Sequence, residues 1–252
     1  MHASTRAFWL PKAGNTADEY EDAFWVEPAG KQPDDVVRLA VADGATETSF
    51  AGLWAALLAR DFCQGRLDGA ALPDALAPLQ GAWREYVATR PLPWYAEEKV
   101  RQGAFSSLLG LTVTNGAAAG GDWEALAIGD SCLFQVRDGD LLGAFPLTGA
   151  AEFTSRPALL SSDPARNAVL PEHLVSAVGD WETGDSFYLM TDALACWFLA
   201  AAEAGDRPWL TLRDLDPTGL ARSFADWVAA ERAAGRLRND DVTLLWVDLA
   251  AN

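Results

Sequence analysis

The sequence is poor in histidine and cysteine, and this shortage disfavours two classes of site. Its 252 residues include two histidines and three cysteines. The cysteines show no CxxC or Cys/His metal spacing, so we expect them to be buried free thiols in a cytoplasmic protein. A Ser-His-Asp triad or a histidine-ligated zinc site would have to be built on His173, which lies in a Pro-Glu-His loop. Neither is expected.

Positive charge is also scarce. The chain carries 36 acidic and 19 basic residues, which gives a formal charge of −17. Nucleic acids and anionic membranes are bound mainly through basic surface, so neither is an expected partner. The N-terminus lacks a long apolar signal segment, and no apolar run approaches the roughly 18 residues of a membrane span. Half of the residues are hydrophobic, and we expect one domain over residues 1–252.

Hydrophobic periodicity divides the chain into strand meanders and groups of helices. The predicted helices cover residues 49–64, 72–89, 94–101, 193–204 and 220–234. The predicted strands cover residues 23–26, 36–41, 105–114, 123–128, 132–137, 141–145, 186–190 and 242–247. Residues 148–182 are rich in Pro, Ser and Gly, which predicts a long connection containing short strands. This order indicates α+β layering rather than βαβ alternation.

Three aspartates lie at the ends of predicted strands, far apart in the sequence. Asp43 and Asp192 each follow a strand, and Asp240 precedes one. A strand end can hold a carboxylate rigidly at the edge of a sheet. Three carboxylates that converge repel each other unless a cation neutralises them. If these three meet, they suit a hard divalent metal and phosphate chemistry.

Six short motifs follow one another along nearly the whole chain. They are Glu21-Asp22, Ala42-Asp43-Gly44-Ala45, Gly103-Ala104-Phe105-Ser106, Gly129-Asp130-Ser131, Thr191-Asp192-Ala193 and Asp240-Asp241-Val242-Thr243. In this order they resemble the motifs of the metal-dependent protein phosphatase 2C family, as a divergent bacterial-type member, over about residues 5–249. The resemblance implies a four-layer αββα sandwich, in which two mostly antiparallel sheets are flanked by helix pairs. It also implies two Mn²⁺ or Mg²⁺ ions at one end of the sandwich.

The resemblance assigns roles to individual residues. Asp43 would bridge both ions, and the carbonyl of Gly44 would bind one of them. Asp192 and Asp240 would complete the shell of the other ion, so that catalysis would depend on all three aspartates. The pair Glu21-Asp22 would lie beside the metals and hold coordinated waters. This fits the chain, because hard divalent ions prefer oxygen ligands and no softer ligand set is present.

Some positions depart from the family pattern. The arginine that clamps the phosphate in many members, four residues before the glutamate, is Ala17 here. The usual histidine after Asp-Gly is Ala45. Arg6 is therefore a candidate phosphate-binding residue, and Lys12 is a second base nearby in the sequence.

Each motif also has a plainer structural interpretation. In isolation Asp43 favours a plain turn, and the Glu21-Asp22 pair favours a solvated stretch. Asp192 can be an N-cap of the helix that follows it, which is compatible with metal binding. Asp130 we interpret as structural, in a bend between core strands where its carboxylate accepts hydrogen bonds from backbone amides.

The resemblance predicts a phosphatase that hydrolyses phosphoserine or phosphothreonine on a protein, by in-line attack of a hydroxide that bridges two metal ions. Two alternatives stay open. A pseudophosphatase that binds a partner is favoured by the altered clamp and disfavoured by the retained carboxylates, because clustered charges are costly without ions. A phosphatase for a small phosphoester is also open, because no segment that would recruit a protein is visible.

Overall fold

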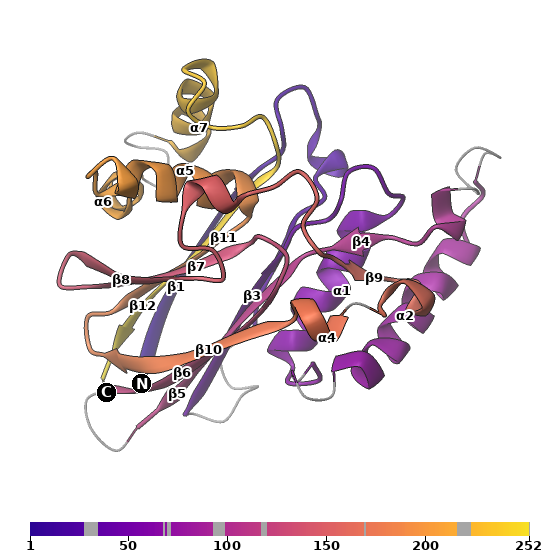
Figure 1. The fold of residues 1–252 in the computed structure, drawn as a ribbon, viewed down its shortest axis with the longest axis horizontal. Helices are drawn as coiled ribbons and strands as arrows, with labels where there is room; N and C mark the ends of the chain where they lie inside the picture. Colours follow the sequence, from indigo (N-terminus) through magenta and orange to yellow (C-terminus); the bar gives the residue numbers. More distant parts are fainter. Residues whose placement is uncertain are drawn as a thin grey trace.

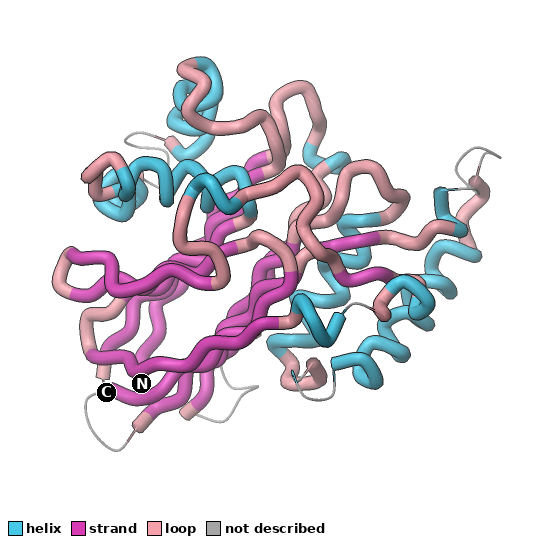
Figure 2. The backbone as a smooth tube through the Cα atoms, viewed as in Figure 1, coloured by secondary structure: helices cyan, strands magenta, loops and turns pink. Residues whose placement is uncertain are grey.

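Two antiparallel sheets lie face to face at the centre of the molecule, and helices cover both outer faces (Figures 1 and 2). The computed structural model describes residues 1–27, 35–67, 69, 72–92, 99–116, 120–168, 170–215 and 223–251. The first sheet has the strand order β1-β12-β11-β7-β8, and the second has the order β10-β6-β5-β3-β2. The predicted four-layer αββα sandwich is confirmed.

The strands of each sheet come from distant parts of the chain. The first sheet contains β1 (His2–Leu10), β12 (Val242–Ala250), β11 (Ser186–Met190), β7 (Cys132–Arg137) and β8 (Asp140–Phe145). The second contains β10 (Val175–Glu182), β6 (Gly120–Ile128), β5 (Leu108–Asn115), β3 (Val36–Ala42) and β2 (Ala23–Val26). A short pair is formed by β4 (Phe105–Ser106) and β9 (Leu160–Ser161).

The helices form the two outer layers. The second sheet is covered by α1 (Ala51–Cys63) and α2 (Leu72–Ala88), and the first by α5 (Asp192–Glu203), α6 (Pro208–Arg213) and α7 (Phe224–Ala233) (Figure 1). The shorter elements are α4 (Leu170–His173) and the 3-10 turns η1 (Ala17–Glu19), η3 (Ala150–Glu152) and η4 (Pro164–Arg166). The predicted helix over 94–101 lies largely outside the described residues. No described helix has the length and apolar character of a membrane span.

Strand alternation separates the inner core from the core beneath the helices. In β12, Leu245 and Val247 are buried between the sheets, whereas Leu244 and Trp246 belong to the cluster under α5, α6 and α7. This period of two is what a strand covered on both faces requires. Each fully buried side chain of this size stabilises the fold by roughly 1.5–3 kcal/mol.

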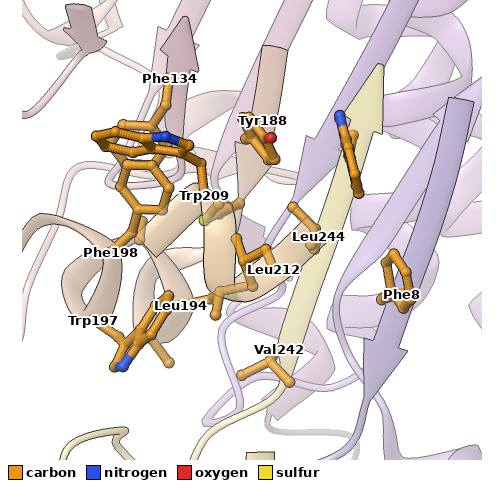
Figure 3. Packing of buried hydrophobic residues seen from close by; sticks show 14 of the residues in the cluster. Phe8, Phe134, Tyr188, Leu194, Trp197, Phe198, Trp209, Leu212, Val242 and Leu244 are labelled. Carbon is orange, nitrogen blue, oxygen red and sulfur yellow. The ribbon is translucent and has the colours of Figure 1, made fainter. Parts of the chain in front are cut away.

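Aromatic rings fill the layer between the first sheet and its helices (Figure 3). Phe134 of β7 stacks on Phe198 of α5, with ring centroids 4.1 Å apart. Trp197 meets Trp227 of α7 edge to face at 4.8 Å. The first contact fixes α5 on the sheet and the second joins it to α7, and α5 begins at Asp192.

Two strands were missed by the sequence prediction. β1 was not predicted, and β10 lies within the stretch that was expected to contain only short strands. Both are edge strands, each paired with a single neighbour. Phe8 is the one buried residue of β1, and Trp181 is the one buried residue of β10. A strand with so little buried surface carries almost no hydrophobic alternation to detect.

The topology brings four strand ends to one end of the sandwich. β3 and β6 end beside the start of β5, and β11 ends beside the starts of β7 and β12, as the antiparallel pairings show. The chain termini lie side by side at the opposite end, where His2 pairs with Ala250 (Figure 1). Residues just after β3, β6 and β11 and just before β12 therefore gather in space.

Candidate metal centre

Three aspartates meet at this end of the sandwich. One carboxylate oxygen from each of Asp43, Asp130 and Asp192 lies within 4.8 Å of the other two. Asp43 follows β3, Asp130 follows β6 by way of Gly129, and Asp192 opens α5. The structure thus brings together two of the three aspartates from which the sequence predicted a metal site, and it adds Asp130.

Asp43 is held by backbone contacts rather than in a free turn. Its amide donates to Ser107 Oγ at 3.0 Å, and its carbonyl accepts from the Ser107 amide at 2.8 Å. Gly44 forms a β-bridge with Ser106, and a Cβ atom at Gly44 would lie 2.6 Å from the carbonyl oxygen of Glu21. Only glycine fits this close approach. The plain-turn interpretation of the Asp-Gly pair does not describe this bridged geometry.

Asp130 is the residue whose position in the cluster the sequence interpretation missed. The preceding Gly129 has φ +100°, which turns the chain sharply after β6. Ser131 Oγ and Ser107 Oγ are 2.8 Å apart, so this turn is tied to the segment that holds Asp43. Burial raises the pKa of Asp130 to about 7, and the charge of Asp192 adds to the shift. The available signal was its place after a strand, which Asp43 and Asp192 share.

An arginine lies against the outer side of the cluster. A guanidinium nitrogen of Arg238 donates to the carboxylate of Asp192, and its Nε lies 3.8 Å from Asp240 Oδ2. Burial raises the pKa of Asp192, while the charge of Arg238 acts in the opposite direction. Thr191, not Asp192, is the N-cap residue of α5.

Asp240 lies at the exposed edge of the cluster. Its side chain is 39% exposed, and it is not one of the three carboxylates whose oxygens are closest. Its negative charge nevertheless raises the pKa of Asp43, Asp130 and Asp192. Asp240 is therefore close enough to add charge to the site.

Asp22 is buried beside the cluster. Its Oδ2 accepts hydrogen bonds from Thr191 Oγ1 at 2.9 Å and from Thr243 Oγ1 at 2.6 Å. Burial raises its pKa to about 8, the two threonine hydrogen bonds oppose this, and nearby carboxylates add to it. Asp22 links the first strands of the second sheet to β11 and β12 of the first sheet.

Asp241 positions the segment that carries Glu21. Its two carboxylate oxygens accept hydrogen bonds from the backbone amides of Lys12 and Glu21, each at 2.8 Å. Glu21 is half-buried, and burial raises its pKa although a hydrogen bond from Thr46 opposes the shift. Lys12 Nζ donates to the same Thr46 hydroxyl at 3.1 Å. Lys12 and Glu21 therefore face one another across Thr46.

Arg6 does not lie with these residues. Its guanidinium forms an ion pair with Asp248 at 3.1 Å and stacks over the ring of Trp246 at 4.3 Å. In the register of β1 and β12, Arg6 pairs with Trp246 on the face that α6 covers. Of the two bases considered from the sequence, Lys12 is the one that the structure brings beside Glu21.

The cluster suits a hard divalent cation. Burial raises the pKa of Asp43 well above its usual range, and the charges of Asp22 and Asp192 add to this. Within the described part of the chain, no group donates a hydrogen bond to the Asp43 carboxylate. Oxygens within 4.8 Å of one another can share an ion that binds each at roughly 2.0–2.6 Å. All of the converging ligand atoms are carboxylate oxygens, and none of the three free cysteines is among them.

Comparisons with known proteins find relatives by structure and not by sequence. No protein-family model matches the chain, and no curated protein sequence matches it. The structure of RsbX in complex with magnesium is 16% identical, with a TM-score of 0.53 and coverage of 99% of this chain and 96% of that one. The catalytic domain of the serine/threonine protein phosphatase PstP, in complex with two manganese ions, has a TM-score of 0.55 at 14% identity, covering 99% of both chains.

A third similar structure contains the PP2C phosphatase domain and a fragment of the regulatory domain of SpoIIE from Bacillus subtilis. It has a TM-score of 0.56 at 13% identity, covering 100% of this chain and 64% of that one. The chain has the phosphatase 2C fold. At 13–16% identity the likeness is one of fold, and within this phosphatase 2C fold the acidic cluster lies where strands of both sheets end.

Proposed function

We propose that the protein is a metal-dependent phosphatase that hydrolyses phosphoserine or phosphothreonine on proteins, with residues 1–252 as a single catalytic domain. The observation that carries this proposal is the set of carboxylates of Asp43, Asp130 and Asp192, one buried and two partly buried, which meet within 4.8 Å in a phosphatase 2C fold. Burial of several like charges without matching cations is costly, and this cost suits a site that binds metal ions.

The ligands proposed for two Mn²⁺ or Mg²⁺ ions are Asp43, Gly44, Asp192 and Asp240, together with Asp130. When bound, the ions supply an acidified water as the nucleophile for in-line attack and positive charge for the phosphate oxygens. Asp43, Asp192 and Asp240 are the residues on which activity should depend most.

The other residues around the cluster position groups for this chemistry. Glu21 and Asp22 are proposed to hold waters of the metal shell. Asp22 is fixed by its two threonine hydrogen bonds, and Glu21 by the hydrogen bond from its amide to Asp241. Lys12 lies beside Glu21 across Thr46, where its ammonium group can bind a phosphate oxygen. Lys12, rather than Arg6, is therefore the proposed phosphate contact.

A second candidate function is a phosphatase-like module that binds a partner without turnover. The contact between Arg238 and Asp192 favours it, because a guanidinium group can neutralise part of the cluster in place of a metal ion. Among the described residues, however, the ion pairs of Arg238 are with Asp192 and Asp240, and none is formed with Asp43 or Asp130. A small phosphoester as substrate is a third candidate.

Hydrolysis of p-nitrophenyl phosphate with added Mn²⁺ tests the proposal. We expect turnover that depends on Mn²⁺ or Mg²⁺ and is lost with a chelator. Absence of turnover in the presence of either ion, from folded protein, would support the binding module instead. Comparison of phosphopeptides with a panel of small phosphoesters then separates the protein substrate from the metabolite.

A further inference from the structure

A cleft of about 480 Å³ opens beside the metal-site residues. Glu21 and Thr46 line it, and so does Lys12, whose ammonium group donates to the Thr46 hydroxyl. The backbone amide of Glu21 donates to the carboxylate of Asp241 at 2.8 Å, and Asp241 follows Asp240 in the chain, so the cleft begins beside the acidic cluster. A phosphorylated residue bound at the metal-site residues would place its neighbouring residues in this cleft.

The walls of the cleft are acidic and aromatic. Asp18 and Glu19 of the turn η1 line one part, and Phe50 and Tyr86 line another. The Glu19 carboxylate is fixed on this wall, because it accepts hydrogen bonds from the amide and the hydroxyl of Thr16 at 2.9 and 3.0 Å. Asp18 is exposed, and within the described part of the chain it forms no hydrogen bond or ion pair.

The aromatic wall already stacks on a guanidinium group from this chain. Phe50 and Tyr86 meet edge to face with ring centroids 6.3 Å apart. The guanidinium of Arg90 lies 4.5 Å from the Tyr86 ring centroid and donates to its hydroxyl at 2.7 Å. Rings next to carboxylates suit a cationic side chain, because the ring contacts its alkyl part or its guanidinium plane while the carboxylates neutralise its charge.

Lys12 and the acidic wall divide the cleft by charge. Among the described residues that line the cleft, Lys12 is the one with a cationic side chain, and it lies with Thr46 and Glu21. The carboxylates of Asp18 and Glu19 would repel a second anion. The occupant that complements both parts has a phosphate near Lys12 and a positive charge near the acidic wall.

We propose that this cleft binds an arginine or lysine next to the phosphorylated residue, so that the substrates are phosphoserine or phosphothreonine sites in basic segments of proteins. This proposal rests on the proposed function and adds the class of substrate. The selectivity arises from charge complementarity at an exposed surface, and it should weaken as salt screens these charges.

The test compares two phosphothreonine peptides that differ only in the flanking residues, arginine in one and glutamate in the other. With Mn²⁺-loaded protein at low salt we expect kcat/KM to be about tenfold higher for the arginine peptide, from two or three exposed charge pairs. The preference should fall in 0.5 M NaCl, because the shorter Debye length screens these exposed charge pairs. Equal kcat/KM for both peptides at low salt would overturn the proposal.

Variants locate the effect in the cleft. Asp18→Asn should reduce the preference for the arginine peptide about two- to fivefold and leave turnover of p-nitrophenyl phosphate unchanged. Asp122→Asn removes an exposed carboxylate at the far end of β6 and should leave the preference as it was. An equal loss of preference in both variants would show that net charge, and not the cleft, selects the peptide.

The two proposals fail in different ways. If p-nitrophenyl phosphate is hydrolysed but the peptides are not distinguished, the basic-segment proposal is wrong and the phosphatase proposal stands. If no phosphoester is hydrolysed, fluorescence anisotropy of the same labelled peptides still tests the cleft. Tighter binding of the arginine peptide that Asp18→Asn weakens would support the cleft, and equal binding would overturn it.

Discussion

Buried carboxylates lie at both ends of the sandwich, and their partners differ. At the end near the chain termini, Asp185 has no exposed surface and accepts hydrogen bonds from Gln135 at 2.9 Å and from Arg137 at 2.8 Å. Arg137 also forms ion pairs with Asp180 and Glu182 of β10, and so joins the two sheets. At the other end, the carboxylate of Asp43 accepts no hydrogen bond from the described residues, and Arg238 forms ion pairs with Asp192 and Asp240.

The difference separates a structural use of buried charge from a functional one. A buried carboxylate with several donors is satisfied, and removing its partner is costly. A group of carboxylates that lie together with few donors lowers stability unless a cation binds, so such a group is expected where a ligand is needed. Substitutions at one end of the sandwich can leave the other end intact.

The largest effect is expected for activity at the acidic end. Asp43→Asn and Asp192→Asn should each lower kcat/KM for p-nitrophenyl phosphate by about a thousandfold or more, because each removes a proposed ligand of ions that supply the nucleophile and stabilise charge. Steady-state kinetics with saturating Mn²⁺ measures this. Asp122→Asn, with the same chemical change far from the cluster, should retain full activity. Near-normal activity of Asp43→Asn would refute the site.

The opposite end should govern stability instead. Arg137→Ala leaves the buried Asp185 without its main donors, so the free energy of unfolding should fall by about 3 kcal/mol. Urea unfolding of the metal-free protein measures the change. Activity per folded molecule should be unchanged at a temperature where the variant is folded. A stability loss in Asp43→Asn as large as that in Arg137→Ala would remove the distinction between the two ends.

The pH dependence of stability should report the acidic end. Asp22 and Asp130 have pKa values of about 8 and about 7 in the folded protein, above the roughly 3.9 of an unfolded aspartate. Their contribution to the free energy of unfolding is therefore full below about pH 4 and is lost as the pH rises to 7–8. The loss is up to about 1.4 kcal/mol per pH unit for each group that is protonated in the folded protein and ionised in the unfolded chain.

Thermal unfolding of the metal-free protein between pH 5 and 8.5 tests this dependence. We expect the melting temperature to fall as the pH rises, and to fall less in Asp130→Asn, which cannot lose a proton. Mn²⁺ binds the deprotonated ligands, so its stabilisation should grow with pH. A melting temperature that rises with pH in metal-free protein would contradict the assignment of these carboxylates.

The smallest effect is expected at the phosphate contact. Lys12→Ala should raise KM for a phosphopeptide by about tenfold, because it removes a charge-assisted hydrogen bond to the phosphate. Lys12→Arg should restore much of the binding, because it keeps the charge. Arg6→Ala should leave KM unchanged, since Arg6 is held by Asp248. A larger KM effect for Arg6→Ala than for Lys12→Ala would reverse this assignment.

Much of the acidic end could be predicted from the sequence, because the relevant residues follow strongly hydrophobic strands. This rule identifies Asp43 and Asp192. Asp192 follows β11, in which every residue is buried. Asp130 obeys the same rule, yet its Gly-Asp-Ser context also fits a structural bend. Local sequence does not distinguish the two, because the distance between Asp130 and Asp192 depends on the pairing of β7 with β11.

The cations around the site could not be predicted in this way. Arg6 and Lys12 are close in the sequence, but strand register places Arg6 over Trp246 while a turn carries Lys12 to Thr46. Arg238 reaches Asp192 through a long flexible side chain, and nothing in its sequence context indicates this contact. The position of the charged group on so long a side chain is set by tertiary packing and not by sequence periodicity.

Mn²⁺ binding measured by isothermal titration calorimetry tests the central claim most directly. The wild-type protein should bind Mn²⁺, whereas Asp43→Asn should lose most of this binding and become more stable than the wild type without metal, because one of the repelling charges is gone. Arg137→Ala, folded under the same conditions, should bind Mn²⁺ as the wild type does. Equal Mn²⁺ binding by the wild type and by Asp43→Asn would contradict the account.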